Sequence, residues 1–170
     1  DHFAKRDDEL SGALARRELH RDFMGYTTRP APHLLAFGMS GIGDVCGRFA
    51  QNDPDLPAWS QAIDAGTFPV VKGHELSRDD RLRRRVILNL MCNLELPWSL
   101  TAAEFGAPAD RLLAAELDEL QPLIDDGLVA RDERGLRVTA TGRYFVRNVA
   151  MVFDAYLRQD QGRPLFSRTV

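Results

Sequence analysis

Five arginines lie close together near the middle of the chain, and they are the residues best suited to bind an anionic group. They are Arg78, Arg81, Arg83, Arg84 and Arg85. A guanidinium group binds a carboxylate through two parallel hydrogen bonds. One interpretation of the run is a clamp for a substrate with several carboxylates, with Arg78, Arg83 and Arg84 as the candidate substrate residues. The alternative is a solvated helix face paired with Asp79 and Asp80, because exposed charge runs are common.

Glycines surround the end of a short apolar run at residues 34–39 and could admit a ligand. They are Gly38, Gly41, Gly43 and Gly47. Backbone without side chains allows close approach, and ligands bind at the carboxyl ends of strands in α/β folds. The spacing is not that of the dinucleotide fingerprint, because the third glycine comes one position late. From the residues alone, the segment is a ligand site or a structural turn.

Metal binding and nucleophilic catalysis have little support in the composition. The two cysteines, Cys46 and Cys92, are far apart, and the four histidines are scattered without a helical pair. A closed metal site needs more ligands than two cysteines supply. We therefore expect no metal to be held by this chain, and no catalytic serine or cysteine stands out.

Charge and hydropathy exclude several classes of partner. The net charge is −3, which gives no electrostatic reason to expect nucleic acid or an anionic membrane. No apolar run approaches the roughly 20 residues that span a bilayer, and the first residues lack the apolar stretch of a signal peptide. We expect a cytoplasmic protein.

The elements that must position these residues differ between the two halves of the chain. In the first half we expect a helix at 7–22, a strand at 34–39 that is buried on both faces, and a helix at 44–52. This is one βα unit. A helix at 56–65, stopped by Gly66, and an extended segment at 67–76 follow.

The second half has a clearer helical pattern. Ser77 is a candidate N-cap for a helix whose apolar face includes Leu82, Val86 and Leu90. Further helices are expected at 101–105, 110–124 and 145–156, with a β-hairpin at 128–138. The predicted fold is mainly α with a small β-hairpin. Its domains are 1–52 (the βα unit), 53–76 (a linker) and 77–170 (a helical, winged-helix-like module).

A winged-helix order raises the possibility of DNA binding, because such modules often insert their third helix into the major groove. Residues 107–126, the candidate recognition segment, carry six acidic residues and one arginine. Contact with phosphates requires positive charge. We therefore expect no nucleic-acid partner and a structural use of the module.

An ordered set of short motifs extends over nearly the whole chain and resembles one enzyme family. The motifs are Asp1-His2-Phe3-Ala4, Glu18-Leu19-His20-Arg21-Asp22-Phe23-Met24-Gly25-Tyr26-Thr27-Thr28, Gly38-Met39-Ser40-Gly41-Ile42, Phe49-Ala50-Gln51-Asn52, Arg78-Asp79-Asp80, Arg83-Arg84, Cys92-Asn93, Asp126-Gly127-Leu128-Val129, Val138-Thr139-Ala140-Thr141-Gly142-Arg143, Arg147-Asn148, Phe153-Asp154-Ala155-Tyr156-Leu157-Arg158-Gln159 and Phe166-Ser167-Arg168. Together they resemble the C-terminal part of oxygen-independent coproporphyrinogen III oxidases. These are radical S-adenosylmethionine (SAM) enzymes of haem synthesis.

The resemblance implies a partial (β/α) barrel that holds a 4Fe–4S cluster and two SAM molecules. In that chemistry a deoxyadenosyl radical abstracts a hydrogen atom from a propionate of coproporphyrinogen III. Loss of carbon dioxide and an electron then leaves a vinyl group, and the reaction takes place on two propionates. The family's cluster-binding CxxxCxxC motif is absent from this chain. The resemblance therefore makes the chain a C-terminal part that is inactive alone, with 1–52 as the last βα unit of the barrel.

The resemblance also implies site residues and partners. Phe23 and Ile42 match family contacts to the second SAM, and Met24 stands where the family usually has glutamine. The implied partners are coproporphyrinogen III and the N-terminal barrel of the same polypeptide, and an unpaired strand at 34–39 would favour self-association of the fragment. The alternatives are part of a divergent radical SAM paralogue that binds porphyrin or haem, and a stand-alone winged-helix interaction module.

Overall fold

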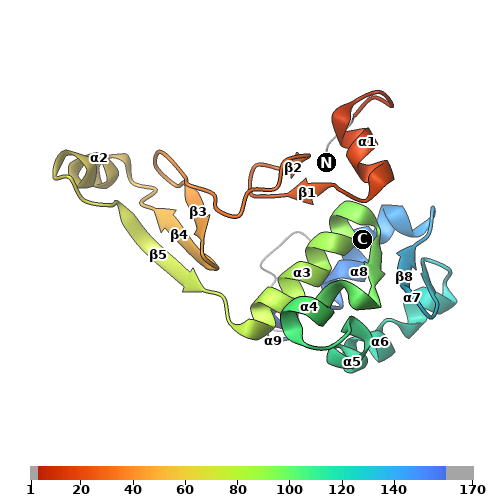
Figure 1. Cartoon of the computed structure of the whole chain (residues 1–170). Coiled ribbons are helices and arrows are strands. Elements are labelled where there is room, and N and C mark those ends of the chain that lie inside the picture. The colour runs from red at the N-terminus through yellow and green to blue at the C-terminus, as the bar shows by residue number, and fades with distance from the viewer. Residues whose placement is uncertain (1–3, 160–170) are drawn as a thin grey trace.

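The computed structural model describes residues 4–159 and gives three structural regions (Figure 1). An N-terminal segment carries α1 (Glu9–Arg16), β1 (His20–Arg21) and β2 (Tyr26–Thr27). An arm follows, built from a three-stranded antiparallel sheet and one helix, and a helical body forms the rest. Residues 1–3 and the predicted terminal motif Phe166-Ser167-Arg168 lie outside the described part. The fold is mixed α and β, with small antiparallel sheets.

Helix α1 is shorter than the predicted helix at 7–22. The Asp8 carboxylate accepts the Leu10 N–H at 2.8 Å and caps its first turn. Arg17 then adopts a left-handed conformation, with φ of 63°, and ends the helix. The chain continues into β1, which pairs with β2 in antiparallel fashion. The N-terminal segment therefore contains a helix and a two-stranded ribbon.

The prediction of a βα unit at 34–52 is wrong for both of its elements. Residues 34–39 form no strand apart from one bridge between Leu34 and Asp44, and the Phe37 side chain is 90% exposed. The expected helix at 44–52 is a hairpin of β3 (Ile42–Val45) and β4 (Arg48–Asn52). Its two-residue turn, Cys46-Gly47, has positive φ at both positions, the conformation of a type I′ hairpin turn. The predicted self-association started from the missing strand, and it stays a prediction.

The segment at 53–76 adds a helix and a strand to the arm (Figure 1). Helix α2 (Leu56–Asp64) is capped by the Asp55 carboxylate, and Gly66 follows it with φ of 70°, as predicted. Strand β5 (Val70–Glu75) pairs with β4 and completes the order β3-β4-β5. The expected linker thus contains an extended segment that is part of a sheet.

The helical body begins with the longest helix of the described residues, α3 (Arg78–Asn93). Ser77 and Asp80 form a capping box: the Ser77 hydroxyl accepts the Asp80 N–H at 3.1 Å, and the Asp80 carboxylate accepts the Ser77 N–H at 2.8 Å. This confirms the predicted N-cap. The predicted apolar face is also confirmed at Leu82, Val86 and Leu90, which are buried.

The helix expected at 110–124 is divided into α5 (Ala109–Leu112), α6 (Ala114–Glu119) and α7 (Gln121–Asp125). Leu113 leaves the helical region, with φ of −126° and ψ of 34°, and Pro122 stands at the start of α7. Leu113, Leu117 and Leu120 are nevertheless buried, so the apolar stripe was predicted correctly although the helix is broken.

A three-stranded sheet closes the body. Strands β7 (Val129–Arg131) and β8 (Gly135–Val138) form the predicted hairpin, and β6 (Glu95–Pro97), which was not predicted, pairs with β8. The remaining elements are η1 (Trp98–Thr101), α4 (Ala102–Phe105), η2 (Gly142–Phe145), α8 (Val146–Met151) and α9 (Ala155–Gln159).

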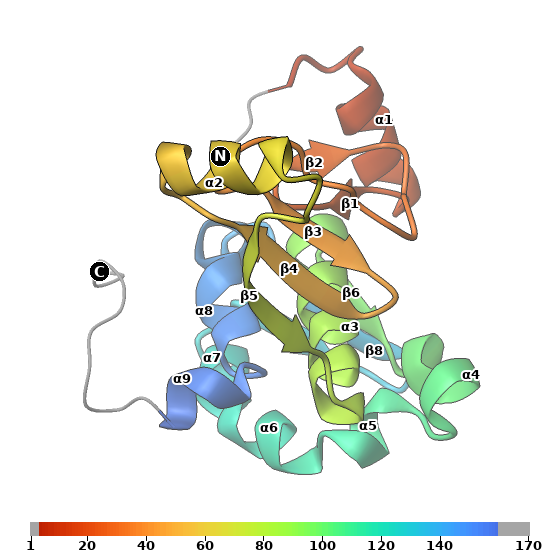
Figure 2. The same cartoon turned by 90° about the vertical axis from the view of Figure 1, so that its left-hand side faces the viewer.

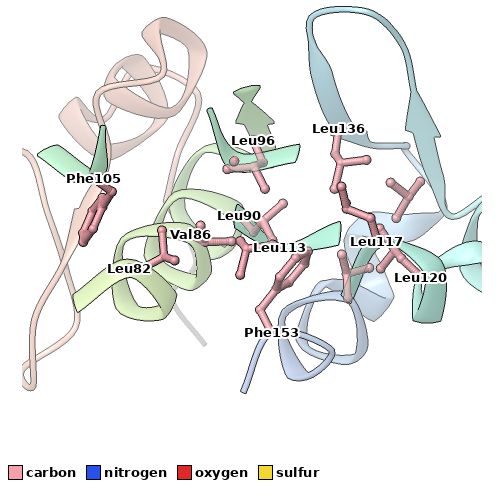
Figure 3. Close-up of a cluster of buried hydrophobic side chains, with 13 residues drawn as sticks. Leu82, Val86, Leu90, Leu96, Phe105, Leu113, Leu117, Leu120, Leu136 and Phe153 are labelled. Carbon is pink, nitrogen blue, oxygen red and sulfur yellow. The ribbon is translucent and has the colours of Figure 1, made fainter. Parts of the chain in front are cut away.

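One hydrophobic core holds these elements together (Figure 3). Leu82, Val86 and Leu90 of α3 meet Phe153, and Leu96 and Leu136 of the sheet. Figure 3 shows Leu113, Leu117 and Leu120 extending the same cluster toward the sheet. Among the described residues, no helix is both long and apolar enough to cross a membrane.

Candidate functional site

A pocket of about 660 Å³ lies where the arm, the N-terminal segment and α3 meet. The views in Figure 1 and Figure 2 show the N-terminal segment and the sheet of the arm on one side of α3. The apolar lining of the pocket includes Phe23, Leu34, Phe49, Leu76 and Ile87. An apolar concave surface with a few converging polar groups is typical of a ligand site.

Helix α3 supplies one wall of the pocket. Asp80, Arg83, Arg84, Ile87 and Leu88 all line it. These positions are separated by three, four, seven and eight residues, so they share one side of the helix. The wall is charged near the start of α3 and apolar one turn later.

The sheet of the arm supplies the opposite wall. Asp44 pairs with Phe49 across β3 and β4, and Phe49 pairs with His74 across β4 and β5. Residues that face each other across paired strands project to the same side of a sheet. All three line the pocket. Ile42 is two positions before Asp44 on β3, on the same face of the sheet, but it is half-buried and is not among the residues that line the pocket.

Phe23 enters the pocket from the turn between β1 and β2. The Asp22 carboxylate accepts the N–H groups of Met24 and Gly25, at 2.7 and 3.1 Å, and so fixes the turn. The Phe23 ring meets the Phe49 ring edge-on, with 5.4 Å between their centroids. Met24 follows Phe23 but its side chain is 85% exposed and does not line the pocket.

The three predicted substrate arginines have different environments. Arg83 and Arg84 line the pocket, whereas Arg78 does not and donates to the Phe105 carbonyl at 2.8 Å. Arg84 pairs with the Asp44 carboxylate. The three arginines therefore have separate partners within the chain, and their role in binding a substrate stays a prediction.

Arg83 is the most strongly paired of the three. Its guanidinium lies 2.7 Å from the Asp79 carboxylate and 2.9 Å from that of Glu116, and it donates to the Phe153 carbonyl at 3.1 Å. Burial lowers the pKa of Arg83, but the hydrogen bonds to Asp79 and Glu116 outweigh that effect and the pKa is raised. Arg83 therefore stays charged and ties α3 to α6 at the pocket.

A second group of polar side chains, which the sequence did not predict, also lines the pocket. The Tyr156 hydroxyl donates to the Asp80 carboxylate at 2.9 Å, and His74 Nε2 lies 3.8 Å from that carboxylate. Hydrogen bonding with Ser77 is the largest cause that lowers the pKa of Asp80. Bonding to Asp80 raises the pKa of Tyr156. These residues come from β5, α3 and α9, so no local sequence pattern joins them.

A cluster of iron and sulfur has no ligand set in this chain. The sequence contains two cysteines, of which Cys46 is exposed in the hairpin turn and Cys92 is buried in α3. Within residues 4–159, no group of three or more histidine, cysteine or acidic side chains is arranged to hold a metal ion.

Comparison with known proteins places this fold in a family. Residues 76–145 match the model of the HemN C-terminal domain. The chain is 43% identical to an oxygen-independent coproporphyrinogen III oxidase of Synechocystis sp. and 41% identical to that of Escherichia coli, in each case over 100% of this chain and 37% of the relative. A relative from Thermostichus vulcanus is 39% identical and is covered over 52% of its length.

A solved structure agrees with the sequence matches. It is described as coproporphyrinogen III oxidase (HemN) from Escherichia coli, a radical SAM enzyme, and it superposes with a TM-score of 0.87 at 42% identity. The superposition covers 92% of this chain and 36% of that protein. The family match defines residues 76–145 as a HemN C-terminal domain. The structural superposition also includes most of the chain outside this range.

The sequence and structure matches agree on one part of one kind of enzyme. The chain corresponds to the C-terminal portion of oxygen-independent coproporphyrinogen III oxidases, and the solved relative is described as a radical SAM enzyme. It spans little more than a third of their length, 37% of the enzymes from Synechocystis sp. and Escherichia coli.

Proposed function

We propose that this chain is the C-terminal part of an enzyme that oxidatively decarboxylates two propionates of coproporphyrinogen III to vinyl groups, giving protoporphyrinogen IX. The observation that supports the proposal is the match along the full chain to oxygen-independent coproporphyrinogen III oxidases, with 43% identity to the enzyme of Synechocystis sp.. The rest of the polypeptide would supply the 4Fe–4S ligands, and the winged-helix-like module at 77–170 would cover the active site. We expect the enzyme in the cytoplasm.

The chain's own contribution would be one side of the second SAM site. Bound SAM supplies the deoxyadenosyl radical for hydrogen abstraction, and the protein's task is to hold and shield the reacting groups. Phe23 and Ile42 offer apolar surface for the adenosyl part. Met24 would contribute through its backbone next to Phe23, because its side chain points away from the pocket.

For the substrate, the candidate residues are Arg78, Arg83 and Arg84. Of these, Arg83 and Arg84 are at the pocket, and each already has a carboxylate partner. A propionate would have to compete with these partners for the guanidinium groups. Arg78 would act only if the porphyrin extends beyond the pocket toward the start of α3.

The second candidate is a radical SAM paralogue that binds a porphyrin or haem without decarboxylating it. Met24 favours it, because the family usually has a glutamine there that can hydrogen bond. The two candidates share the SAM site and differ in the product. A stand-alone interaction module has no observation in its favour, since the whole chain aligns with parts of longer enzymes.

Equilibrium binding of SAM to the full-length polypeptide tests the assigned site. Ile42→Asp places a carboxylate at a half-buried position of β3, on the same face as the pocket residue Asp44, and a bound adenosyl group would bury this charge at a cost. We expect this change to weaken the second SAM site more than Arg84→Ala does. Ile63→Asp, on the exposed helix α2, is the matched control and should leave binding unchanged. Equal SAM binding by the wild type and Ile42→Asp would exclude this site.

A further inference from the structure

Arg84 lies at the pocket and already has two partners within the protein. Its Nη2 pairs with the Asp44 carboxylate, and its guanidinium lies 5.2 Å from the centroid of the Phe49 ring. The edge of the guanidinium therefore serves the ion pair and its face serves the aromatic ring. Both are interactions that favour arginine over lysine.

Asp44 is held firmly in the position that receives Arg84. Its N–H and carbonyl both form hydrogen bonds with Leu34, each of 2.8 Å, and it pairs with Phe49 across the hairpin. Its side chain is only 14% exposed. A second tie joins the hairpin to the start of α3, because the Leu76 N–H donates to the Gly47 carbonyl at 2.9 Å.

Phe49 extends this arrangement to Phe23. The edge-on contact between the two rings has an interplanar angle of 79°, a preferred geometry for aromatic pairs. Phe23 lies in a turn and is 53% exposed, so the turn alone leaves its ring weakly constrained. The contacts run without interruption from Arg84 in α3, through Asp44 and Phe49 in the hairpin, to Phe23.

We infer that Arg84 and Asp44 are a positioning pair that fixes Phe23 at the pocket, and that this role takes Arg84 out of the set of candidate substrate residues named above. The inference rests on the proposed function for the role of Phe23. For Arg84 to bind a propionate it would have to leave Asp44, and a largely buried carboxylate without its partner is costly. Loss of either member should instead loosen Phe49 and with it Phe23.

The test uses the full-length polypeptide with Asp44→Asn, Arg84→Met and the double variant. SAM binding is measured by equilibrium dialysis, and KM is measured for SAM and for coproporphyrinogen III. We expect each single change to weaken the second SAM site about tenfold, which is about 1.4 kcal/mol. The double variant should lose no more than either single one, because the two residues act as a unit. The KM for coproporphyrinogen III should not change.

Two further variants make the result specific. Arg84→Lys keeps the charge and should recover part of the SAM affinity, although it loses the planar contact with Phe49. Arg48→Met removes the exposed pair of Arg48 and Glu75, 2.7 Å apart on the opposite side of the same sheet. Exposed pairs contribute little, so this control should bind SAM as the wild type does. Thermal unfolding checks that every variant is folded.

Three outcomes overturn the inference and are distinguishable. If Arg84→Met raises the KM for coproporphyrinogen III and Asp44→Asn does not, then Arg84 binds the substrate. If Phe23→Ala weakens SAM binding while the two positioning variants do not, the positioning pair alone is wrong. If Phe23→Ala leaves SAM binding unchanged, Phe23 does not contact SAM and the proposed SAM site is wrong. The positioning role of Arg84 and Asp44 is then wrong as well.

Discussion

The side chain of Asn93, at the end of α3, accepts a hydrogen bond from the backbone N–H of Leu19 at 3.1 Å. The bond is buried and joins residues 74 positions apart. Asn93 Nδ2 also donates to Asn89 Oδ1 at 3.1 Å, and Asn89 donates to the Glu95 carbonyl. This short network attaches the N-terminal segment, and with it the turn that carries Phe23, to the helical body.

Replacement of Asn93 by leucine should therefore destabilise the chain. The change keeps a similar volume but leaves the Leu19 N–H buried without an acceptor, which costs about 1–3 kcal/mol. Urea unfolding followed by circular dichroism measures the effect. Gln61→Leu, on the exposed side of α2, is the control and should be close to neutral. Equal stability of wild type and Asn93→Leu would show that the N-terminal segment does not depend on this bond.

Gly142 should tolerate no side chain. A Cβ atom there would lie 1.9 Å from the Leu128 carbonyl oxygen, and that oxygen already accepts the Thr139 N–H. Gly142→Ala must move the backbone next to the hairpin, so we expect it to cost about 2 kcal/mol or more. At Gly73 the nearest atom would be 3.6 Å away, so Gly73→Ala serves as the control. An unchanged denaturation midpoint for Gly142→Ala would refute the packing at this site.

The two cysteines should react very differently with a thiol reagent. Cys92 is 2% exposed, and burial raises the pKa of its thiol to about 11, so almost none of it is thiolate at neutral pH. Cys46 is exposed in the turn between β3 and β4. Titration of the native chain near neutral pH should modify Cys46 rapidly and leave Cys92 unmodified, and denaturant should release the second thiol. Rapid modification of both in the native state would contradict this packing of α3.

The capping box of α3 should give the chain a pH-dependent stability. The pKa of Asp80 is lowered in the folded state, chiefly by hydrogen bonding with Ser77. Ionised Asp80 therefore stabilises the fold above its unfolded pKa of about 3.9, and this contribution is lost as the pH falls through the lower folded value.

Asp80→Asn should accordingly lower the free energy of unfolding by about 1 kcal/mol at neutral pH. The loss should be much smaller at a pH low enough to protonate Asp80 in the folded wild type. Urea midpoints of the wild type and Asp80→Asn at a series of pH values measure the difference. Asp118→Asn, an exposed residue of α6, should show no such convergence. A constant difference between wild type and Asp80→Asn down to the lowest pH would show that the charge of Asp80 is not what stabilises the cap.

Local signals in the sequence predicted the helical body well. The Ser77 cap, the face of Leu82, Val86 and Leu90 and the hairpin of β7 and β8 depend on neighbouring residues or on a single periodicity, and all are present. The β6 strand was missed because it is short and its partner β8 is distant in the sequence, with Leu96 pairing with Leu136.

The arm was predicted poorly, for a physical reason that can be identified. Residues 34–39 are a continuous apolar run, which suggests a buried strand, but the folded chain gives them little cover. The turn of the hairpin has Cys46 at φ of 52°, where asparagine or glycine would have been a recognisable signal. Pairing of β4 with β5 across α2 has no local pattern at all.

The site could be predicted only in part. Phe23, Arg83 and Arg84 were named from the sequence and do line the pocket, whereas Ile42, Met24 and Arg78 were also named and do not line it. Asp44, Phe49, His74 and Tyr156 were missed as site residues because they come together from different elements. The pairing of Arg84 with Asp44 depends on the register of the β3–β4 hairpin. The sequence did not predict this hairpin, so it could not predict the pair.

The most direct test of the central claim is product analysis with the full-length polypeptide. The anaerobic enzyme, with its cluster reconstituted, is incubated with coproporphyrinogen III, SAM and a reductant, and the products are analysed by mass spectrometry. The account predicts protoporphyrinogen IX, with two molecules of carbon dioxide released per porphyrin, and deoxyadenosine formed alongside. Deoxyadenosine formation that leaves every propionate of coproporphyrinogen III intact would contradict the assignment and favour the paralogue.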